Sequence, residues 1–146
     1  MSVRQTVPPG PGRSAPVSPT ELLRMPGRPL CVAADADPSI NRFVATVLAR
    51  AGFDVRPLAG PWEVAATPLG GVALVVLGGR GRGVSAADAA RALRAAGHRT
   101  PVVVLVNSPD PAAAALAAAD PAVRLVEKPF TPTEFEAAVG ALVGRA

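Results

Sequence analysis

The sequence predicts an α/β fold in which a five-stranded parallel sheet is doubly wound by helices. Two observations lead to this prediction. Short apolar runs alternate with stretches of helical periodicity from Leu30 to the end of the 146-residue chain, as expected when crossover helices connect parallel strands. Residues 72–77 are apolar without interruption, which is typical of a strand buried on both faces of a parallel sheet. We therefore expect one globular domain over residues 30–146.

The first half of this domain is expected to hold three of the strands. Residues 30–34 are an apolar run, and Asp37 and Pro38 after it favour the cap and first turn of a helix. Counted from Ile40, apolar residues follow at i+3, i+4, i+7, i+8 and i+11, and Gly52 is suited to end this helix. The segments that follow are a strand, a short helix and a buried central strand, at residues 53–58, 61–66 and 72–77.

The second half is expected to hold two strands and three helices. Ser85 and Asp88 form a capping-box pattern, and Gly97 is suited to end the helix that they begin. The remaining segments are a strand, an alanine-rich helix, a strand and a last helix, at residues 102–106, 111–119, 123–126 and from 131 onward. Five strand–helix units with short connections make a sheet of flavodoxin-like type, whose ligand sites lie at the carboxyl ends of the strands.

Composition excludes several classes of function. Aromatic residues make up 3% of the chain, so the usual platform for stacking bases is missing. One cysteine, Cys31, and one histidine, His98, exclude an intramolecular disulfide framework or a Cys-based zinc cluster and disfavour a His-metal enzyme or a Ser-His-Asp triad. No run of about 18 apolar residues exists, and no signal-peptide pattern opens the chain. We therefore expect a cytoplasmic protein without a membrane span.

Residues 1–29 are rich in Pro, Gly, Ser and Arg, and this composition predicts a disordered arm. Within the arm, Ser18, Pro19, Thr20 and Glu21 carry a capping-box pattern that predicts one short helix. The arm holds four arginines and one acidic residue, so most of the net charge of +4 lies there. A basic arm of this kind adds weak phosphate affinity at most, and we expect no nucleic-acid partner.

Polar or unusual residues follow three of the predicted strands. They are Asp35 and Asp37, the segment GGRGRG at residues 78–83, and the segment EKPF that contains Lys128. Over residues 30–146 the chain resembles the CheY-like receiver domain of bacterial two-component response regulators. The segments that carry the resemblance are VAADADPSINRFVATVLARAGFDV, RALRAAGHRTPVVVLV and VEKPFTPTEFEAAVGAL, and Lys-Pro-Phe is the most specific short feature.

The resemblance implies a degenerate receiver. Receivers accept a phosphoryl group on an aspartate at the end of the third strand, beside a magnesium ion held by acidic residues after the first strand. Here the acceptor position is Gly78, which has no nucleophile, and the acidic pair becomes Asp35 and Ala36. The position of the Thr or Ser that contacts the phosphoryl group is Val106. Lys128 and Asp35 are what remains of the reactive set, and Leu125 stands where an aromatic switch residue is common.

One carboxylate beside a lysine and two arginines does not supply the several oxygen ligands that magnesium needs. We therefore expect no bound metal, no cofactor, no phosphotransfer and no enzymatic activity, and an ion pair between Asp35 and Lys128. The function that this implies is a stand-alone degenerate receiver acting as a phosphorylation-independent protein-interaction module in two-component or phosphorelay-type signal transduction.

Two alternatives remain open at this point. The glycines and arginines of the GGRGRG segment could form an anion site, from Gly78, Gly79, Arg80, Gly81 and Arg82, in a small-ligand or nucleotide sensor. An exposed flexible loop is the simpler interpretation of that segment. The other alternative is a genuine phosphorelay receiver whose acceptor is displaced to Asp35 or Asp37.

The expected partner is a signalling or regulatory protein, or a second copy of the chain. Many receivers use the fourth helix, fifth strand and fifth helix as a working face, and the alanine-rich helix here permits close approach of a partner. The candidate contacts on this face are Leu116, Arg124, Leu125, Glu136 and Gly140.

Overall fold

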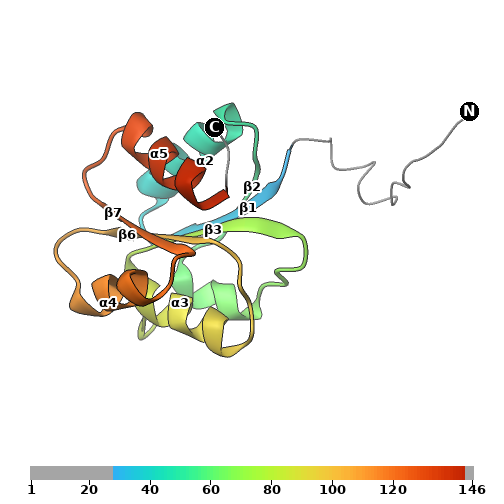
Figure 1. Cartoon of the computed structure of the whole chain (residues 1–146). Coiled ribbons are helices and arrows are strands. Elements are labelled where there is room, and N and C mark those ends of the chain that lie inside the picture. The colour runs from blue at the N-terminus through green and yellow to red at the C-terminus, as the bar shows by residue number, and fades with distance from the viewer. Residues whose placement is uncertain (1–27, 144–146) are drawn as a thin grey trace, which may run out of the picture.

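A computed structural model describes residues 28–143. Its five parallel strands form one sheet in the order β2-β1-β3-β6-β7 (Figure 1). The strands are β1 (Leu30–Asp35), β2 (Asp54–Pro57), β3 (Val72–Gly78), β6 (Val102–Val106) and β7 (Val123–Glu127). The predicted five-stranded parallel sheet is therefore confirmed, with β3 at its centre.

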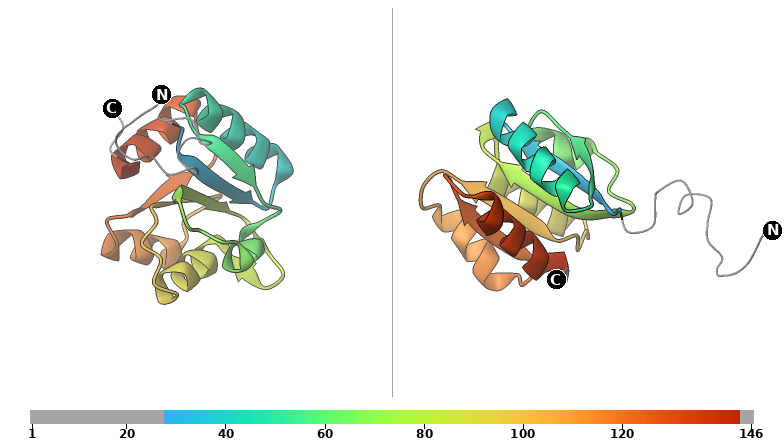
Figure 2. Two further views of the ribbon diagram at one scale, coloured as in Figure 1. Left: turned by 90° about the vertical axis from the view of Figure 1, so that its right-hand side faces the viewer. Right: turned by 90° about the horizontal axis from the view of Figure 1, so that it is seen from above.

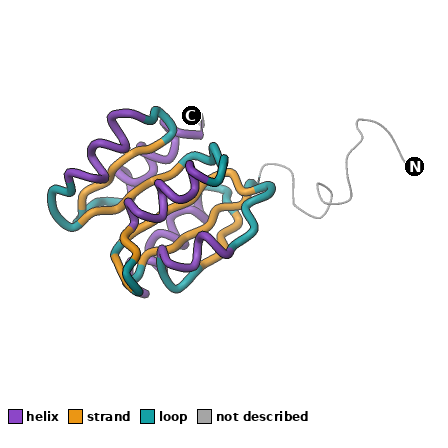
Figure 3. Tube along the Cα trace, turned by 90° about the horizontal axis from the view of Figure 1, so that it is seen from below, coloured by secondary structure: helices purple, strands orange, loops and turns teal. Residues whose placement is uncertain are grey.

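Helices cover both faces of this sheet (Figures 1 and 2). On one face lie α2 (Pro38–Arg50) and α5 (Pro132–Val143), and on the other lie α3 (Ala86–Ala95) and α4 (Pro111–Ala119). The short 3₁₀ helix η1 (Pro61–Ala66) packs against α3. Strand and helix alternate along the chain (Figure 3), which is the doubly wound arrangement that the sequence predicts.

The polar residues before three helices explain where those helices begin. The Asp37 side chain accepts a hydrogen bond from the first turn of α2. Ser85 and Asp88 hydrogen-bond to each other's backbone N–H groups, both at 3.0 Å. Thr131 and Glu134 form the same reciprocal pair at 2.8 and 3.0 Å. These contacts confirm the predicted helix starts, because each satisfies N–H groups that have no partner within a helix.

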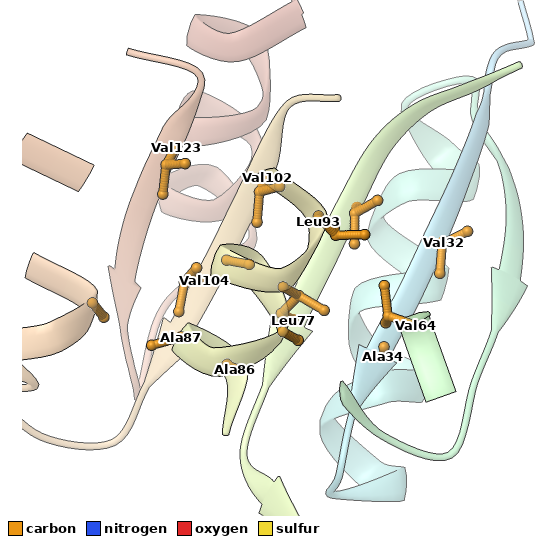
Figure 4. Packing of buried hydrophobic residues seen from close by; sticks show 14 of the residues in the cluster. Val32, Ala34, Val64, Leu77, Ala86, Ala87, Leu93, Val102, Val104 and Val123 are labelled. Carbon is orange, nitrogen blue, oxygen red and sulfur yellow. The ribbon is translucent and has the colours of Figure 1, made fainter. Parts of the chain in front are cut away.

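The sheet separates two apolar cores. The core under α3 and α4 is built from short aliphatic side chains, including Val64, Leu77 and Leu93 (Figure 4). The core under α2 and α5 contains the two fully buried aromatics, Phe53 and Phe135. Cys31 lies in this second core, where burial raises the pKa of its thiol well above the usual range. It is therefore an inert packing residue.

Strand ends differ slightly from the sequence prediction, and one difference matters for the site. β1 and β3 each extend one residue beyond the predicted run, so that Asp35 and Gly78 are paired neighbours in the sheet. The backbone N–H of Ala36 also donates to the carbonyl of Gly78 at 3.0 Å. Backbone hydrogen bonds therefore hold the carboxyl end of β1 next to the carboxyl end of β3.

Arg94 of α3 is a largely buried charged residue that links two turns of the domain. Its side chain is 12% exposed, and its Nε lies 2.6 Å from Oδ2 of Asp120. Its Nη1 donates to the carbonyls of His98 and Thr100 at 3.1 and 2.8 Å. A guanidinium has several donors in a fixed arrangement, so this one side chain joins the turn after α3 to the turn before β7.

The predicted short helix at Ser18–Glu21 and nearly all of the predicted arm lie outside the described residues. The first described residue, Arg28, contacts the domain. Its Nε lies 3.0 Å from Oδ1 of Asp54, and its Nη2 donates to the carbonyl of Phe53 at 3.1 Å. Within residues 28–143, no helix is long and apolar enough to cross a membrane.

Candidate functional site at the strand ends

The carboxyl ends of β1, β3 and β7 bring Asp35, Gly78 and Lys128 together. Nζ of Lys128 lies 2.9 Å from Oδ2 of Asp35, and their side chains are 12% and 0% exposed. This ion pair confirms the one that the sequence predicts. A carboxylate and an ammonium that are both buried must neutralise each other, because either charge alone is costly to remove from water.

The Asp35 side chain is fixed at its other oxygen as well. Oδ1 accepts a hydrogen bond from the backbone N–H of Asp37 at 2.8 Å. Oδ2 is fully buried and accepts no hydrogen bond of good geometry, so its partner is the charge of Lys128. The carboxylate therefore depends on that ammonium for its stability.

Asn41 is a site residue that sequence reasoning missed. Its Oδ1 accepts from the backbone N–H of Asp35 at 2.9 Å, and its Nδ2 donates to the carbonyl of Leu58 at 3.0 Å. It is 8% exposed. A signal was present in the sequence, because Asn41, Val44 and Leu48 fall at i, i+3 and i+7, which places an amide on the apolar stripe of α2.

Gly78 lies directly beneath the Asp35 carboxylate. A Cβ at this position would overlap Oδ2 of Asp35 and would lie 2.7 Å from its Cγ. Any side chain at Gly78 therefore requires Asp35 to move. The Asp35 carboxylate can occupy this inward position because residue 78 of β3 has no side chain. For the same reason, β3 offers no nucleophile at this position.

The other residues that the sequence resemblance assigns to a degenerate phosphoacceptor pocket lie around this arrangement. An open pocket of about 680 Å³ is lined by residues that include Asp35, Ala36 and Lys128. Val106 ends β6 and lines an adjoining pocket, and its carbonyl accepts from the backbone N–H of Lys128 at 2.7 Å. The five residues that the resemblance groups together thus lie in one region.

The residues at this edge do not fit a magnesium ion. The Asp35 carboxylate is already paired with an ammonium, and the position of the second carboxylate is Ala36. No group of three or more His, Cys, Asp or Glu residues within residues 28–143 is arranged to hold a metal. Magnesium requires several hard oxygen ligands in near-octahedral geometry, and this set does not supply them.

The GGRGRG segment forms a small hairpin where a flexible loop was the simpler prediction. β4 (Arg80–Gly81) pairs antiparallel with β5 (Val84–Ser85), and Arg82 and Gly83 form the turn with φ values of 52° and 74°. Positive φ at both turn residues matches the twist of a two-residue hairpin. In the sequence, Gly81 and Gly83 on either side of Arg82 indicate a turn. Composition does not show that residues 80–81 pair with residues 84–85.

Trp62 of η1 holds this hairpin in place. A Cβ at Gly81 would overlap the Trp62 ring, and the guanidinium of Arg82 lies 5.8 Å from the ring centroid. This contact is a cation–π interaction. Arg80 lies apart from it and lines the strand-end pocket with Lys128. The two arginines that the anion-site hypothesis groups together therefore have different surroundings.

The five candidate interface residues lie on α4, β7 and α5, and β7 is the edge strand of the sheet against which both helices pack. Leu116 and Leu125 are half-buried and pack against the core under α3 and α4, and Arg124 is exposed on β7. Glu136 and Gly140 instead line a groove between α5 and the end of α2. α4 and α5 cover opposite faces of the sheet, so these residues flank its β7 edge from both sides. Whether a partner uses this edge stays a prediction.

Known structures share this architecture. The chemotaxis protein CheY4 of Vibrio cholerae is 19% identical, with a TM-score of 0.66 over 79% of this chain and 98% of that chain. A receiver domain of Francisella response regulator 1452 is 21% identical, with a TM-score of 0.68 over 81% and 98%.

A response regulator receiver protein from Burkholderia phymatum is 26% identical, with a TM-score of 0.64 over 82% of this chain and 98% of that chain. A scan against protein-family models and a search of curated proteins each give no match. These three structures match 79–82% of this chain, and its strand order is the flavodoxin-like order that the sequence resemblance implies. The fold of this chain is that of the CheY-like receiver domain of response regulators.

Proposed function

We propose that this chain is a degenerate receiver domain that acts as a phosphorylation-independent protein-interaction module in two-component or phosphorelay-type signalling in the bacterial cytoplasm. In this proposal residues 30–146 are the receiver-like domain and residues 1–29 are an arm that precedes it. One observation carries the proposal: the Asp35 carboxylate, paired with Lys128 at 2.9 Å, lies over Gly78.

The chemistry of this arrangement supports binding without phosphotransfer. Phosphorylation of a receiver requires a nucleophilic carboxylate at the position of Gly78, and glycine offers none. The ammonium of Lys128 would have to contact the phosphoryl group, but it compensates the buried Asp35 charge instead. Both groups would need to be replaced or moved before phosphoryl chemistry could occur at this edge.

The outer surface of α4 is the surface that we assign to the partner. The exposed residues of this helix are all apolar and carry no charge, namely Pro111, Ala112, Ala114, Ala115, Ala118 and Ala119. We call this set the α4 face. The helix is anchored by Ala113, which is fully buried, and by Leu116. Short side chains allow a partner to approach closely and lose little conformational entropy on binding.

Arginine substitutions on the α4 face test this assignment. Ala115→Arg and Ala118→Arg each place a long charged side chain at the centre of the face. Self-association is measured by analytical ultracentrifugation, and capture of a signalling partner is measured from native extract. Each variant is expected to weaken association by about tenfold or more, which corresponds to about 1.4 kcal/mol, with far-UV circular dichroism unchanged.

Ala92→Arg is the matched control, because Ala92 is an exposed helical alanine on α3. It is expected to associate like the wild type. If the α4 variants associate as strongly as the control, the α4 face is not the partner surface.

One observation favours a second candidate, a sensor of small anions. Arg80 and Lys128 line the same open pocket as Asn107. Calorimetric titration with phosphorylated metabolites and nucleotides tests it, with Arg80→Ala as the informative variant and Arg82→Ala as control. Saturable binding that only Arg80→Ala abolishes would favour the sensor, and the absence of binding would favour the interaction module.

A further inference from the structure

A groove on the other layer of the molecule has no role in the proposed function. It has a volume of about 730 Å³ and lies between α5 and the end of α2. Leu48 and Phe53 lie at its floor and are 1% and 0% exposed, and the more exposed Ala137, Gly140 and Ala141 form the wall on α5. Figure 2 shows α2 and α5 side by side on this layer. We call this feature the α2–α5 groove.

The groove exists because α5 presents small residues toward α2. Ala137, Gly140 and Ala141 fall at i, i+3 and i+4, so they share one face of the helix. No side chain longer than a methyl group stands at these three positions, and the space between the helices is left unfilled. Glu136 is the charged residue among those that line the groove.

The amino-terminal arm enters the domain beside this groove. Arg28 donates to the carbonyl of Phe53 at 3.1 Å and contacts Asp54 at 3.0 Å. Phe53 is also part of the groove floor. Arg28, the first described residue, therefore lies beside the groove rather than on the layer of α3 and α4.

The arm carries a short apolar segment close enough to Arg28 in the sequence to reach the α2–α5 groove. Leu22, Leu23 and Met25 stand within six residues of Arg28, in an arm otherwise dominated by Pro, Gly, Ser and Arg. Six residues span up to about 20 Å when extended, and α5, with 12 residues, is about 18 Å long. Arg24 in this segment has the charge that complements Glu136.

We propose that residues 22–25 of the arm bind in the α2–α5 groove of the same chain. Leu22, Leu23 and Met25 would cover the small residues of the α5 wall, and Arg24 would lie near Glu136. The arm would then occupy the layer opposite the α4 face, so that α5 is covered within the chain while α4 stays available to a partner. This inference is independent of whether the strand-end site binds a ligand.

Cysteine cross-linking in the full-length chain tests the proposal. Leu23→Cys is combined with Ala137→Cys in the groove, and intrachain disulfide formation under mild oxidation is followed by peptide mass spectrometry. The native Cys31 is fully buried and does not compete. The control pair combines Leu23→Cys with Ala96→Cys, an exposed alanine at the end of α3 on the other layer.

The groove pair is expected to cross-link at least about tenfold faster than the control pair, because docking raises the effective concentration of the two thiols. Arg24→Glu and Glu136→Arg should each slow that reaction, and the two together should restore it. Equal rates for the groove and control pairs would overturn the proposal. A disulfide that joins two chains would also overturn it, since the occupant would then be the arm of a second copy.

Discussion

At the level of single residues, the strand-end site holds the buried carboxylate of Asp35, which Lys128 neutralises. This carboxylate fills the space that the absence of a side chain at Gly78 leaves open. The Asp35 carboxylate is fully buried, and one ammonium neutralises it. Gly78 supplies the space, because a Cβ there would overlap Oδ2. Oδ1 of Asn41 accepts a hydrogen bond from the backbone N–H of Asp35 and holds that backbone in position. In the proposed function, this polar cluster stands in place of the phosphoacceptor chemistry of a receiver.

Removal of Lys128 should expose the cost of that buried charge. Lys128→Met leaves the Asp35 carboxylate without a counter-charge, and loss of one partner of a buried pair costs about 3–5 kcal/mol. We expect the free energy of unfolding, measured in urea, to fall by this amount. The double variant Asp35→Asn/Lys128→Met should recover most of it, because the amide still accepts from Asp37. An unchanged or higher stability for Lys128→Met would show that the pair is not structural.

A side chain at Gly78 should be tolerated only when Asp35 is shortened. Gly78→Ala is expected to lower the free energy of unfolding by about 1–3 kcal/mol, as overpacking in a buried site does. In an Asp35→Ala background the same substitution should cost much less. The coupling between the two sites is measured with a double-mutant cycle. Additive effects of the two substitutions would contradict the packing of Asp35 over Gly78.

At the scale of elements, the connections between helices and strands are held by specific side chains. The hairpin of β4 and β5 rests on Trp62, and Arg94 ties the turn after α3 to Asp120. The hydrogen bond from Arg94 is the main reason that the pKa of the Asp120 carboxyl lies below its usual range, and the backbone N–H of Ala122 adds to this effect. Asp120 therefore contributes to stability as a carboxylate.

This contribution should depend on pH in a defined direction. The pKa of Asp120 is lowered by folding, so its contribution is complete above the unfolded-state pKa of about 4 and is lost as the pH falls through the lower folded-state value. At neutral pH, Asp120→Asn should reduce the free energy of unfolding by about 1.5–3 kcal/mol. The difference from wild type should shrink in acid, as urea unfolding at several pH values would show. A difference that does not change with pH would contradict this assignment.

Sequence reasoning succeeded where structure depends on neighbouring residues. Helix starts at Asp37, Ser85 and Thr131 follow from local capping patterns, and the central strand follows from an unbroken apolar run. The ion pair of Asp35 with Lys128 was predictable because parallel strands end at one edge. Contacts that depend on how individual side chains pack against turns and loops were not predictable.

Three features show this limit. The position of Arg94 depends on carbonyls in a turn that only the fold brings near. The contact of Trp62 with Gly81 joins segments from different loops. The groove beside Glu136 results from the packing of α5 beside α2, which a resemblance in sequence does not show.

For the molecule as a whole, the two helical layers on opposite faces of the sheet carry the two surfaces to which we assign roles. The α4 face lies on one side of the sheet and the α2–α5 groove lies on the other. In the proposals above, a partner binds the first and the arm of the same chain binds the second. The strand-end site lies at the edge between them, where its charges are compensated internally. Signalling through this molecule would then depend on binding alone.

The proposed function requires this receiver fold to work without phosphorylation, and intact-protein mass spectrometry can test that requirement. The wild type and Gly78→Asp are incubated with acetyl phosphate and magnesium. Neither mass should change, since Gly78 offers no nucleophile and a restored aspartate would meet Asp35 and lack the second metal-binding carboxylate at Ala36. A magnesium-dependent gain of one phosphoryl group in the wild type, lost in Asp35→Ala, would contradict the proposed function and identify a displaced acceptor.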